Sequence, residues 1–180
     1  MRHRDAVALI ADAGYDPSAS VWADLGSGEG TFTRALASLL APGSVVHAID
    51  RDASALGGLR ASSSVRIVPH ALDFVSSPWP VDVLDGILMA NSLHYVRDQR
   101  GFLARCASRL SSGGRFLIVE YDTAVPSAWV PFPLSRAALA GLFDSVGFCV
   151  RFLGARRSVF RRAALYAAVA SRGIIGGVGA

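Results

Sequence analysis

The sequence predicts a doubly wound α/β fold, in which a mostly parallel sheet has helices on both faces. Three observations support this fold class. Seven short, nearly all-apolar segments of strand length recur along the 180 residues. Segments with helical spacing separate most of them, and a glycine-rich turn follows the first. Because continuous apolar strands are typical of parallel sheets buried on both sides, we expect a single domain of this class.

The predicted strands are apolar runs bounded by turn residues. We expect the third to be closed by Pro69. The strands are predicted at residues 21–25, 45–49, 65–68, 86–90, 115–120, 148–153 and 165–170.

Apolar residues at helical spacing predict four helices. The first ends at Pro42-Gly43, and the third ends at Gly113-Gly114. The segment that follows the third strand is too short for a full helix. The helices are predicted at residues 31–40, 53–61, 99–110 and 136–146.

Composition excludes several classes of protein. Apolar residues make up 52% of the chain and charged residues 18%, which excludes intrinsic disorder. All 18 basic residues are arginine, and the absence of lysine excludes a P-loop NTPase and a lysine Schiff base. The net charge is +4, but no basic run is dense enough to require nucleic acid. The densest group, Arg156, Arg157, Arg161 and Arg162, is interpreted as an ordinary solvated edge.

Cysteine usage and hydropathy bear on the cellular environment. Cys106 and Cys149 form neither a disulfide framework nor a zinc-ligand spacing, so we expect no metal and a reduced environment. No apolar run approaches the roughly 18 residues of a membrane span. The N-terminus makes a poor signal peptide. We therefore expect a cytoplasmic protein that does not bind membranes.

The glycine-rich turn is the first candidate binding site. It reads Asp24-Leu25-Gly26-Ser27-Gly28-Glu29-Gly30-Thr31. Glycines let backbone press against a ligand where a helix starts, although a plain strand-to-helix turn is the alternative. The dinucleotide fingerprint would require glycine or alanine at Thr31. Asp24 would repel a pyrophosphate and suits a ligand that carries an amino group.

A second carboxylate ends the second predicted strand. Asp50 lies about 20 residues beyond the glycine turn, where an acid accepts both hydroxyls of a ribose. The alternative is a helix N-cap, but Asp52 or Ser54 could serve as that cap and leave Asp50 free.

Four segments together resemble a known family. The turn from Asp24 to Gly30 and the acid at Asp50 match its first motif and its ribose-binding acid. His70-Ala71-Leu72-Asp73-Phe74 is similar to its adenine-binding stretch. The segment from Asp85 to Val96 is similar to its fourth-strand motif, an acid and an apolar run followed by Leu-His-x-Val. On these residues the chain resembles the class I S-adenosylmethionine-dependent methyltransferases of the small-molecule type.

The resemblance implies a Rossmann-like sheet of order 3-2-1-4-5-7-6 with the seventh strand antiparallel. It also assigns cofactor contacts. Asp24 lies near the methionine amino group, Asp50 binds the ribose, and Asp73 accepts from the adenine amine. The remaining implied contacts are Gly26, Ser27, Gly28 and Gly30 beneath the cofactor, Arg51 and Phe74 beside adenine, and Ala90 and Asn91 beside the methionine portion.

The acceptor side is open to more than one interpretation. His94 is the candidate general base, with Tyr95 in the same pocket, although His94 could instead cap or pack the following helix. Glu120 could orient an amine or hydroxyl, or be a buried structural acid. Trp129 and Phe132, in the irregular segment 121–133, either line the acceptor pocket or belong to a plain connection.

The resemblance implies methyl transfer from S-adenosyl-L-methionine to oxygen, nitrogen or carbon of a small molecule, leaving S-adenosyl-L-homocysteine. The alternatives are an RNA or protein methyltransferase, a non-catalytic cofactor-binding protein and an NAD-dependent oxidoreductase. We expect residues 1–172 to form the domain, with a short N-terminal helical segment and a flexible tail at 173–180. The short N-terminal segment implies an open active site or one completed by a second subunit, which leaves a homodimer open.

Overall fold

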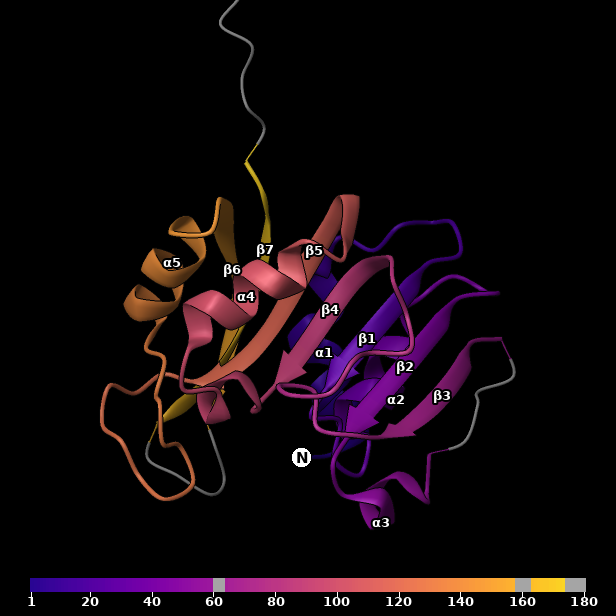
Figure 1. The fold of residues 1–180 in the computed structure, drawn as a ribbon, viewed down its shortest axis with the longest axis horizontal. Coiled ribbons are helices and arrows are strands. Elements are labelled where there is room, and N and C mark those ends of the chain that lie inside the picture. The colour runs from indigo at the N-terminus through magenta and orange to yellow at the C-terminus, as the bar shows by residue number, and fades with distance from the viewer. Residues whose placement is uncertain (60–63, 158–162, 174–180) are drawn as a thin grey trace, which may run out of the picture.

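The computed structural model describes residues 1–59, 64–157 and 163–173. Its centre is a seven-stranded sheet of order β3-β2-β1-β4-β5-β7-β6. The pairs among β1 to β5 are parallel, whereas β7 runs antiparallel to both β5 and β6 (Figure 1). The strand order and the single reversed strand confirm the expectation drawn from the family resemblance.

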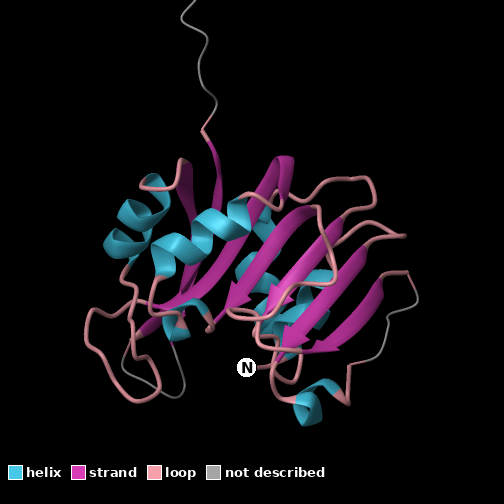
Figure 2. Ribbon diagram, viewed as in Figure 1, coloured by secondary structure: helices cyan, strands magenta, loops and turns pink. Residues whose placement is uncertain are grey.

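All seven predicted strands are present, and most are longer than predicted (Figure 2). The strands are β1 Val21–Leu25, β2 Val45–Asp50, β3 Arg66–Ala71, β4 Leu84–Ala90, β5 Leu110–Tyr121, β6 Phe148–Arg157 and β7 Ala164–Arg172. The helices are α1 His3–Ile10, α2 Thr31–Ala37, α3 Ala53–Leu56, α4 Gln99–Ala107 and α5 Arg136–Asp144, with 3₁₀ turns η1 Ala11–Ala13 and η2 Leu93–Tyr95.

Two predicted boundaries are wrong. Pro69 does not close β3, because it pairs with Ala48 inside the strand. β3 is the edge of the sheet, where the missing N–H of proline has no further strand to bond. Gly113-Gly114 does not end α4, which stops at Ala107; both glycines lie inside β5 instead.

Other boundaries shift by a few residues or fall outside the described chain. The helices predicted to reach residues 40 and 146 end at Ala37 and Asp144. The helix predicted at 53–61 is the short α3, and residues 60–61 are outside the described ranges. So are Arg161 and Arg162, and all of the predicted tail beyond Gly173.

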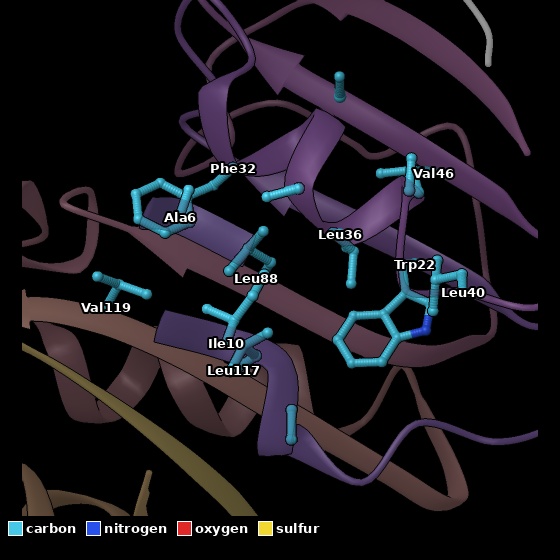
Figure 3. Close-up of a cluster of buried hydrophobic side chains, with 14 of the residues drawn as sticks. Ala6, Ile10, Trp22, Phe32, Leu36, Leu40, Val46, Leu88, Leu117 and Val119 are labelled. Carbon is cyan, nitrogen blue, oxygen red and sulfur yellow. The ribbon is translucent and has the colours of Figure 1, made fainter. Parts of the chain in front are cut away.

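Two apolar clusters are built from alternating residues of the strands. Trp22 of β1 belongs to the cluster that contains Ile10 of α1 and Leu36 of α2 (Figure 3). Ala23, its neighbour along β1, belongs to the cluster that contains Phe102 of α4. Because successive side chains of a strand point to opposite faces, the clusters lie on opposite sides of the sheet. α4 and α5 are in front in Figure 1, with α1 and α2 behind.

The carboxyl ends of the parallel strands meet at one edge of the sheet, and the N-terminus of α1 lies there as well (Figure 1). Ala6, Leu9 and Ile10 bury one face of α1. This packing leaves the first turn of the helix at the edge where ligands bind in open α/β sheets. No helix in the described part of the chain combines the length and apolarity that crossing a membrane requires.

The packing of the sheet is tight where Gly86 of β4 meets Trp22. A Cβ at Gly86 would come within 2.4 Å of ring atoms Cε3 and Cζ3 of Trp22. The ring is buried, and its Nε1 donates to Ser20 Oγ at 3.2 Å, so it has little freedom to move aside. A side chain larger than hydrogen therefore does not fit at this position.

We expect Gly86→Ala to lower the free energy of unfolding by about 1–3 kcal/mol, because it overpacks the core. Gly113→Ala is the matched control: Gly113 is also in a strand, and a Cβ there would meet nothing within 4 Å. Urea denaturation of both variants measures the difference. Equal stability of the two variants would contradict the tight contact.

Candidate functional site

A cavity of about 1120 Å³ opens at the carboxyl edge of the sheet. The glycine-rich turn after β1, the end of β4, and the first turns of α1 and α2 contribute to its walls. It is lined by Met1, Arg2, Asp5, Asp24, Gly26, Ser27, Gly28, Glu29, Thr31, Phe32, Ala90, Asn91, Tyr121, Arg156 and Leu165.

The turn after β1 is fastened to β2 and presents bare backbone to the cavity. The N–H groups of Gly26 and Ser27 both donate to Ile49 O, at 2.8 and 3.1 Å. Gly26, Gly28 and Gly30 have φ of 77°, 51° and 77°, a region that favours glycine. A Cβ at Gly26 or Gly30 would collide with a neighbouring side chain, whereas one at Gly28 would meet nothing within 4 Å. The backbone at Gly28 therefore borders open space that a ligand can fill.

Asp24 is the buried acid of the site. The Thr33 hydroxyl, on α2, donates to Asp24 Oδ2 at 2.6 Å, while Oδ1 has no hydrogen-bond partner in the part of the chain that the structure describes. Burial raises the pKa of Asp24 to about 7, and the nearby Asp50 carboxylate adds to the rise. This carboxylate is thus held in position by one hydrogen bond and is short of a donor on the cavity side.

Three buried side-chain oxygens lack a hydrogen-bond partner among the described residues, and all belong to residues that line the cavity. They are Asp24 Oδ1, Ser27 Oγ and Asn91 Oδ1. A buried polar atom without a partner costs free energy, so such atoms gathered in one place indicate a site built for a ligand. The carboxylate and the amide oxygen are acceptors, and they therefore suit a ligand with N–H or O–H groups.

Asn91 also has an unusual backbone. It is the only non-glycine residue with positive φ in the described ranges, at 56°. Its N–H donates to Val119 O of β5 at 2.8 Å, which anchors the conformation to the sheet. Strained residues of this kind cluster at ligand sites. This backbone conformation turns the chain after Ala90, and both Ala90 and Asn91 line the cavity.

Asp50 is joined to the glycine turn although it does not line the cavity. Its Oδ2 accepts from Gly28 N at 2.8 Å and its Oδ1 from Asp52 N at 2.9 Å. Asp52 is the N-cap of α3 and accepts from Ser54 N at 2.9 Å, so Asp50 does not cap this helix. Each Asp50 oxygen keeps a lone pair for a further donor.

The predicted adenine contacts lie outside the cavity. Asp73 is exposed and accepts from Val75 N at 2.8 Å, and Arg51 is exposed. Phe74 lies closer, because its Cε1 would be 3.3 Å from a Cβ at Gly26. Phe74 therefore lies next to the glycine turn.

His94 and Glu120 form a buried pair. His94 Nδ1 lies 2.6 Å from Glu120 Oε2, and His94 N donates to Glu120 Oε1 at 3.2 Å. Both side chains are at most 2% exposed, and neither residue lines the cavity. The ring of Tyr95 lies 4.4 Å from the His94 ring, and Tyr95 is 52% exposed. His94 and Glu120, which were predicted separately from the sequence, thus form one unit.

The aromatic segment after β5 packs beside this pair. Phe132 N donates to His94 O at 3.0 Å, and the Arg97 guanidinium lies 5.4 Å from the centre of the Phe132 ring. Trp129 is 72% exposed. Neither aromatic residue is among those that line the cavity.

Sequence reasoning missed the part of the cavity wall that α1 and β6 contribute. Arg156, interpreted as part of an ordinary solvated edge, is exposed on the edge strand β6, but it also lines the cavity and pairs with Asp5 at 3.0 Å. No motif marks these residues, which lie far apart in the sequence. Within the described ranges, no group of three or more His, Cys, Asp or Glu residues could hold a metal ion.

Comparisons with known proteins agree with this geometry. The family model of the methyltransferase domain matches residues 23–116. No curated protein matches the chain. The YcgJ protein from Bacillus subtilis superposes with a TM-score of 0.71 at 13% identity, over 94% of this chain and 99% of that chain.

Two further solved structures carry the cofactor or its product. Magnesium protoporphyrin IX methyltransferase from Synechocystis PCC 6803, with bound S-adenosylmethionine, has a TM-score of 0.69 at 16% identity, over 95% of this chain and 78% of that chain. The 1,6-didemethyltoxoflavin-N1-methyltransferase of Burkholderia thailandensis, with its namesake ligand and S-adenosylhomocysteine, has a TM-score of 0.66 at 22% identity, over 95% and 78%. At these identities the likeness shows a shared fold.

The buried acid gives a pH-dependent prediction for the ligand-free protein. The pKa of Asp24 rises from 3.8 to about 7 on folding, so the folded protein binds more protons than the unfolded chain between these values. The free energy of unfolding therefore falls as the pH rises from 3.8 through about 7. We expect Asp24→Asn, which removes the charge, to raise the free energy of unfolding at pH 8 by up to roughly 4 kcal/mol. The gain should shrink toward zero near pH 4.

Thermal or urea denaturation of the ligand-free protein between pH 4 and pH 8 measures this gain. Asp82→Asn is the control, because its side chain is 98% exposed, and the free energy of unfolding should change little at any pH. A gain from Asp24→Asn that does not vary with pH would contradict the raised pKa.

Proposed function

The chain belongs to the class I methyltransferases that use S-adenosyl-L-methionine, and from this premise we propose that it methylates a small-molecule acceptor at oxygen, nitrogen or carbon. The observation that carries the proposal is the cavity at the carboxyl edge of the sheet. Its glycine turn and the three buried oxygens that lack a partner among the described residues suit the amino-acid end of the cofactor. The cavity volume leaves room for a second molecule. Typical single-ligand pockets measure about 300–1,000 Å³.

The cofactor's groups find matching chemistry in this chain. Asp24 Oδ1 would accept from the ammonium group, and Asn91 Oδ1, at the end of β4, would accept from the same portion of the molecule. Ser27 Oγ and the open backbone at Gly28 would border it. Asp50 would receive the ribose hydroxyls. Adenine would lie toward Arg51, Asp73 and Phe74.

When bound, S-adenosyl-L-methionine supplies a methyl group on a sulfonium that is already activated for displacement. The protein's task is therefore to orient the acceptor in line with that methyl group. Orientation of this kind contributes roughly 7–11 kcal/mol without any covalent bond to the enzyme. The anchored turn after β1 and the strained Asn91 provide rigid positions for it.

His94 is the proposed general base for an acceptor that must lose a proton. Glu120 accepts from the His94 backbone and lies against Nδ1, which leaves Nε2 as the other ring nitrogen. A buried carboxylate at Nδ1 fixes the orientation of the ring. His94 lies in the 3₁₀ turn that closely follows the cavity-lining Asn91, and Glu120 directly precedes the cavity-lining Tyr121 on β5. His94 itself does not line the cavity, and its closeness to residues that do supports this role.

The experiment that tests the proposed function is a label transfer. Purified protein would be incubated with methyl-labelled S-adenosylmethionine and a pooled small-molecule extract, an RNA pool or a protein pool in separate reactions. We expect labelled small molecules, detected by mass spectrometry. Label confined to RNA or protein, or to no pool at all, would overturn the proposal.

The ribose assignment predicts that Asp50→Ala weakens the binding of S-adenosylhomocysteine by about 1–3 kcal/mol, because the hydroxyls lose their acceptor. The matched control is Asp52→Ala, which removes the cap of α3 and should cost about 1 kcal/mol of stability but little affinity. Isothermal titration of folded variants measures both. Equal losses of affinity in the two variants would remove Asp50 from the site.

The base assignment predicts that His94→Ala leaves the affinity for S-adenosylhomocysteine unchanged and lowers methyl transfer about 10²–10⁴-fold. Single-turnover rates with an acceptor found in the label-transfer experiment measure the loss, and thermal unfolding controls for stability. A variant that transfers methyl groups at the full rate would show that His94 is structural.

A further inference from the structure

The part of the cavity away from the glycine turn is lined by different kinds of side chain from the rest. We define the acceptor lobe as the residues of the cavity on α1 and directly before it, at the start of α2, and at the ends of β5, β6 and β7. They are Met1, Arg2, Asp5, Phe32, Tyr121, Arg156 and Leu165. We propose that this lobe binds the acceptor and selects a molecule with an apolar body and an anionic oxygen group, a carboxylate or a phosphate. The inference rests on the proposed function for the presence of an acceptor.

The strand register builds one wall of the lobe. Tyr121 of β5 pairs with Leu165 of β7, and Leu165 pairs in turn with Arg156 of β6. The three residues therefore lie side by side across neighbouring strands. The start of α1 supplies the opposite wall, because the Arg156 guanidinium reaches Asp5 across the lobe at 3.0 Å. This bridge joins the N-terminal helix to the antiparallel end of the sheet.

Two guanidinium groups share one carboxylate at this place. Asp5 Oδ1 accepts from Arg156 Nη1, and Asp5 Oδ2 accepts from Arg2 Nε at 3.1 Å. The Arg2, Arg156 and Arg4 charges hold the pKa of Asp5 below its usual value, so it stays ionised at neutral pH. The lobe therefore carries a net positive charge.

Among the described residues, the guanidinium groups keep most of their donors. A guanidinium has five N–H groups, and each arginine gives one of them to Asp5. No other side-chain hydrogen bond of Arg2 or Arg156 occurs within the described residues. The side chains of Arg2 and Arg156 are 70% and 43% exposed, so an anion can reach them. Arginine pairs with carboxylates and phosphates through two donors at once.

Two of the three acidic residues that line the cavity lie on its other half. Asp24 and Glu29 belong to the glycine-rich turn, where the cofactor's ammonium group would bind. Charge thus differs along the cavity: two carboxylates line the cofactor end, and two guanidinium groups with one carboxylate, Asp5, line the acceptor end. Phe32, Leu165 and Tyr121 supply apolar surface between the charged groups. An acceptor with an apolar body and an anionic group matches this arrangement.

The test uses the full chain saturated with S-adenosylhomocysteine and three probes of similar shape. Phenylacetate and phenyl phosphate are anions, and phenylacetamide is the neutral counterpart. We expect isothermal titration at low salt to show that at least one anion binds tenfold or more tightly than the amide. The preference should shrink at 0.5 M salt, because screening weakens exposed charge pairs. The better of the two anions identifies the group that the lobe selects.

Arg156→Gln should lower the affinity for that anion about tenfold and leave the affinity for the amide unchanged. Arg2→Gln, at a more exposed side chain, provides a second variant if the first does not fold. Arg100→Gln is the matched control, because Arg100 is exposed on α4 and does not line the cavity. It should change neither affinity. All three variants should bind S-adenosylhomocysteine as the parent protein does.

Equal binding of anion and amide, absence of anion binding, or a preference that survives both cavity variants would overturn the inference. These outcomes are distinguishable from failure of the proposed function. If S-adenosylhomocysteine itself does not bind, the cofactor site is wrong; if it binds while the anion preference is absent, only the acceptor lobe is wrong.

Discussion

The site depends on one buried carboxylate that the protein leaves incompletely bonded. Asp24 lies near the carboxyl end of β1, with Oδ2 bound to the Thr33 hydroxyl and Oδ1 without a partner among the described residues. In the ligand-free protein this arrangement lowers stability, because burial disfavours the charged form. A cationic group in the cavity reverses that effect. Stability given up at Asp24 is therefore recovered as affinity for a ligand with an ammonium group.

The rest of the fold serves to hold that carboxylate against an open chamber. β1 lies between β2 and β4, so its carboxyl end is bordered by the Asp50 turn on one side and Asn91 on the other. The glycine turn donates to the end of β2, and Asn91 donates to β5. Both loops of the proposed cofactor half are thus hydrogen-bonded to a strand other than the one they follow. Such cross-bracing keeps strained backbone in place where ligands bind.

Local patterns predicted the strands and the turn that form this half of the candidate site. The apolar runs located the strands, and the acid and glycine spacing located the turn, because these features depend on residues close together in the chain. The errors arose where distant contacts decide. Pro69 stays in β3 only because that strand is an edge, and Gly113 and Gly114 belong to β5 because its pairing begins at Leu110. The pairing of His94 with Glu120 likewise needed the sheet to bring the two together.

The acceptor half shows the limit of sequence reasoning more sharply. Asp5 and Arg156 are 151 positions apart, so no spacing signals that they meet. Their ion pair lies partly in water, where such pairs contribute little to stability. Its position is more informative than its strength, because it places guanidinium donors opposite the carboxylates of the cofactor half. A ligand pair with an ammonium group at one end and an anion at the other would match the charges at both ends of the cavity, which is a reason for the chain to carry α1 at this edge.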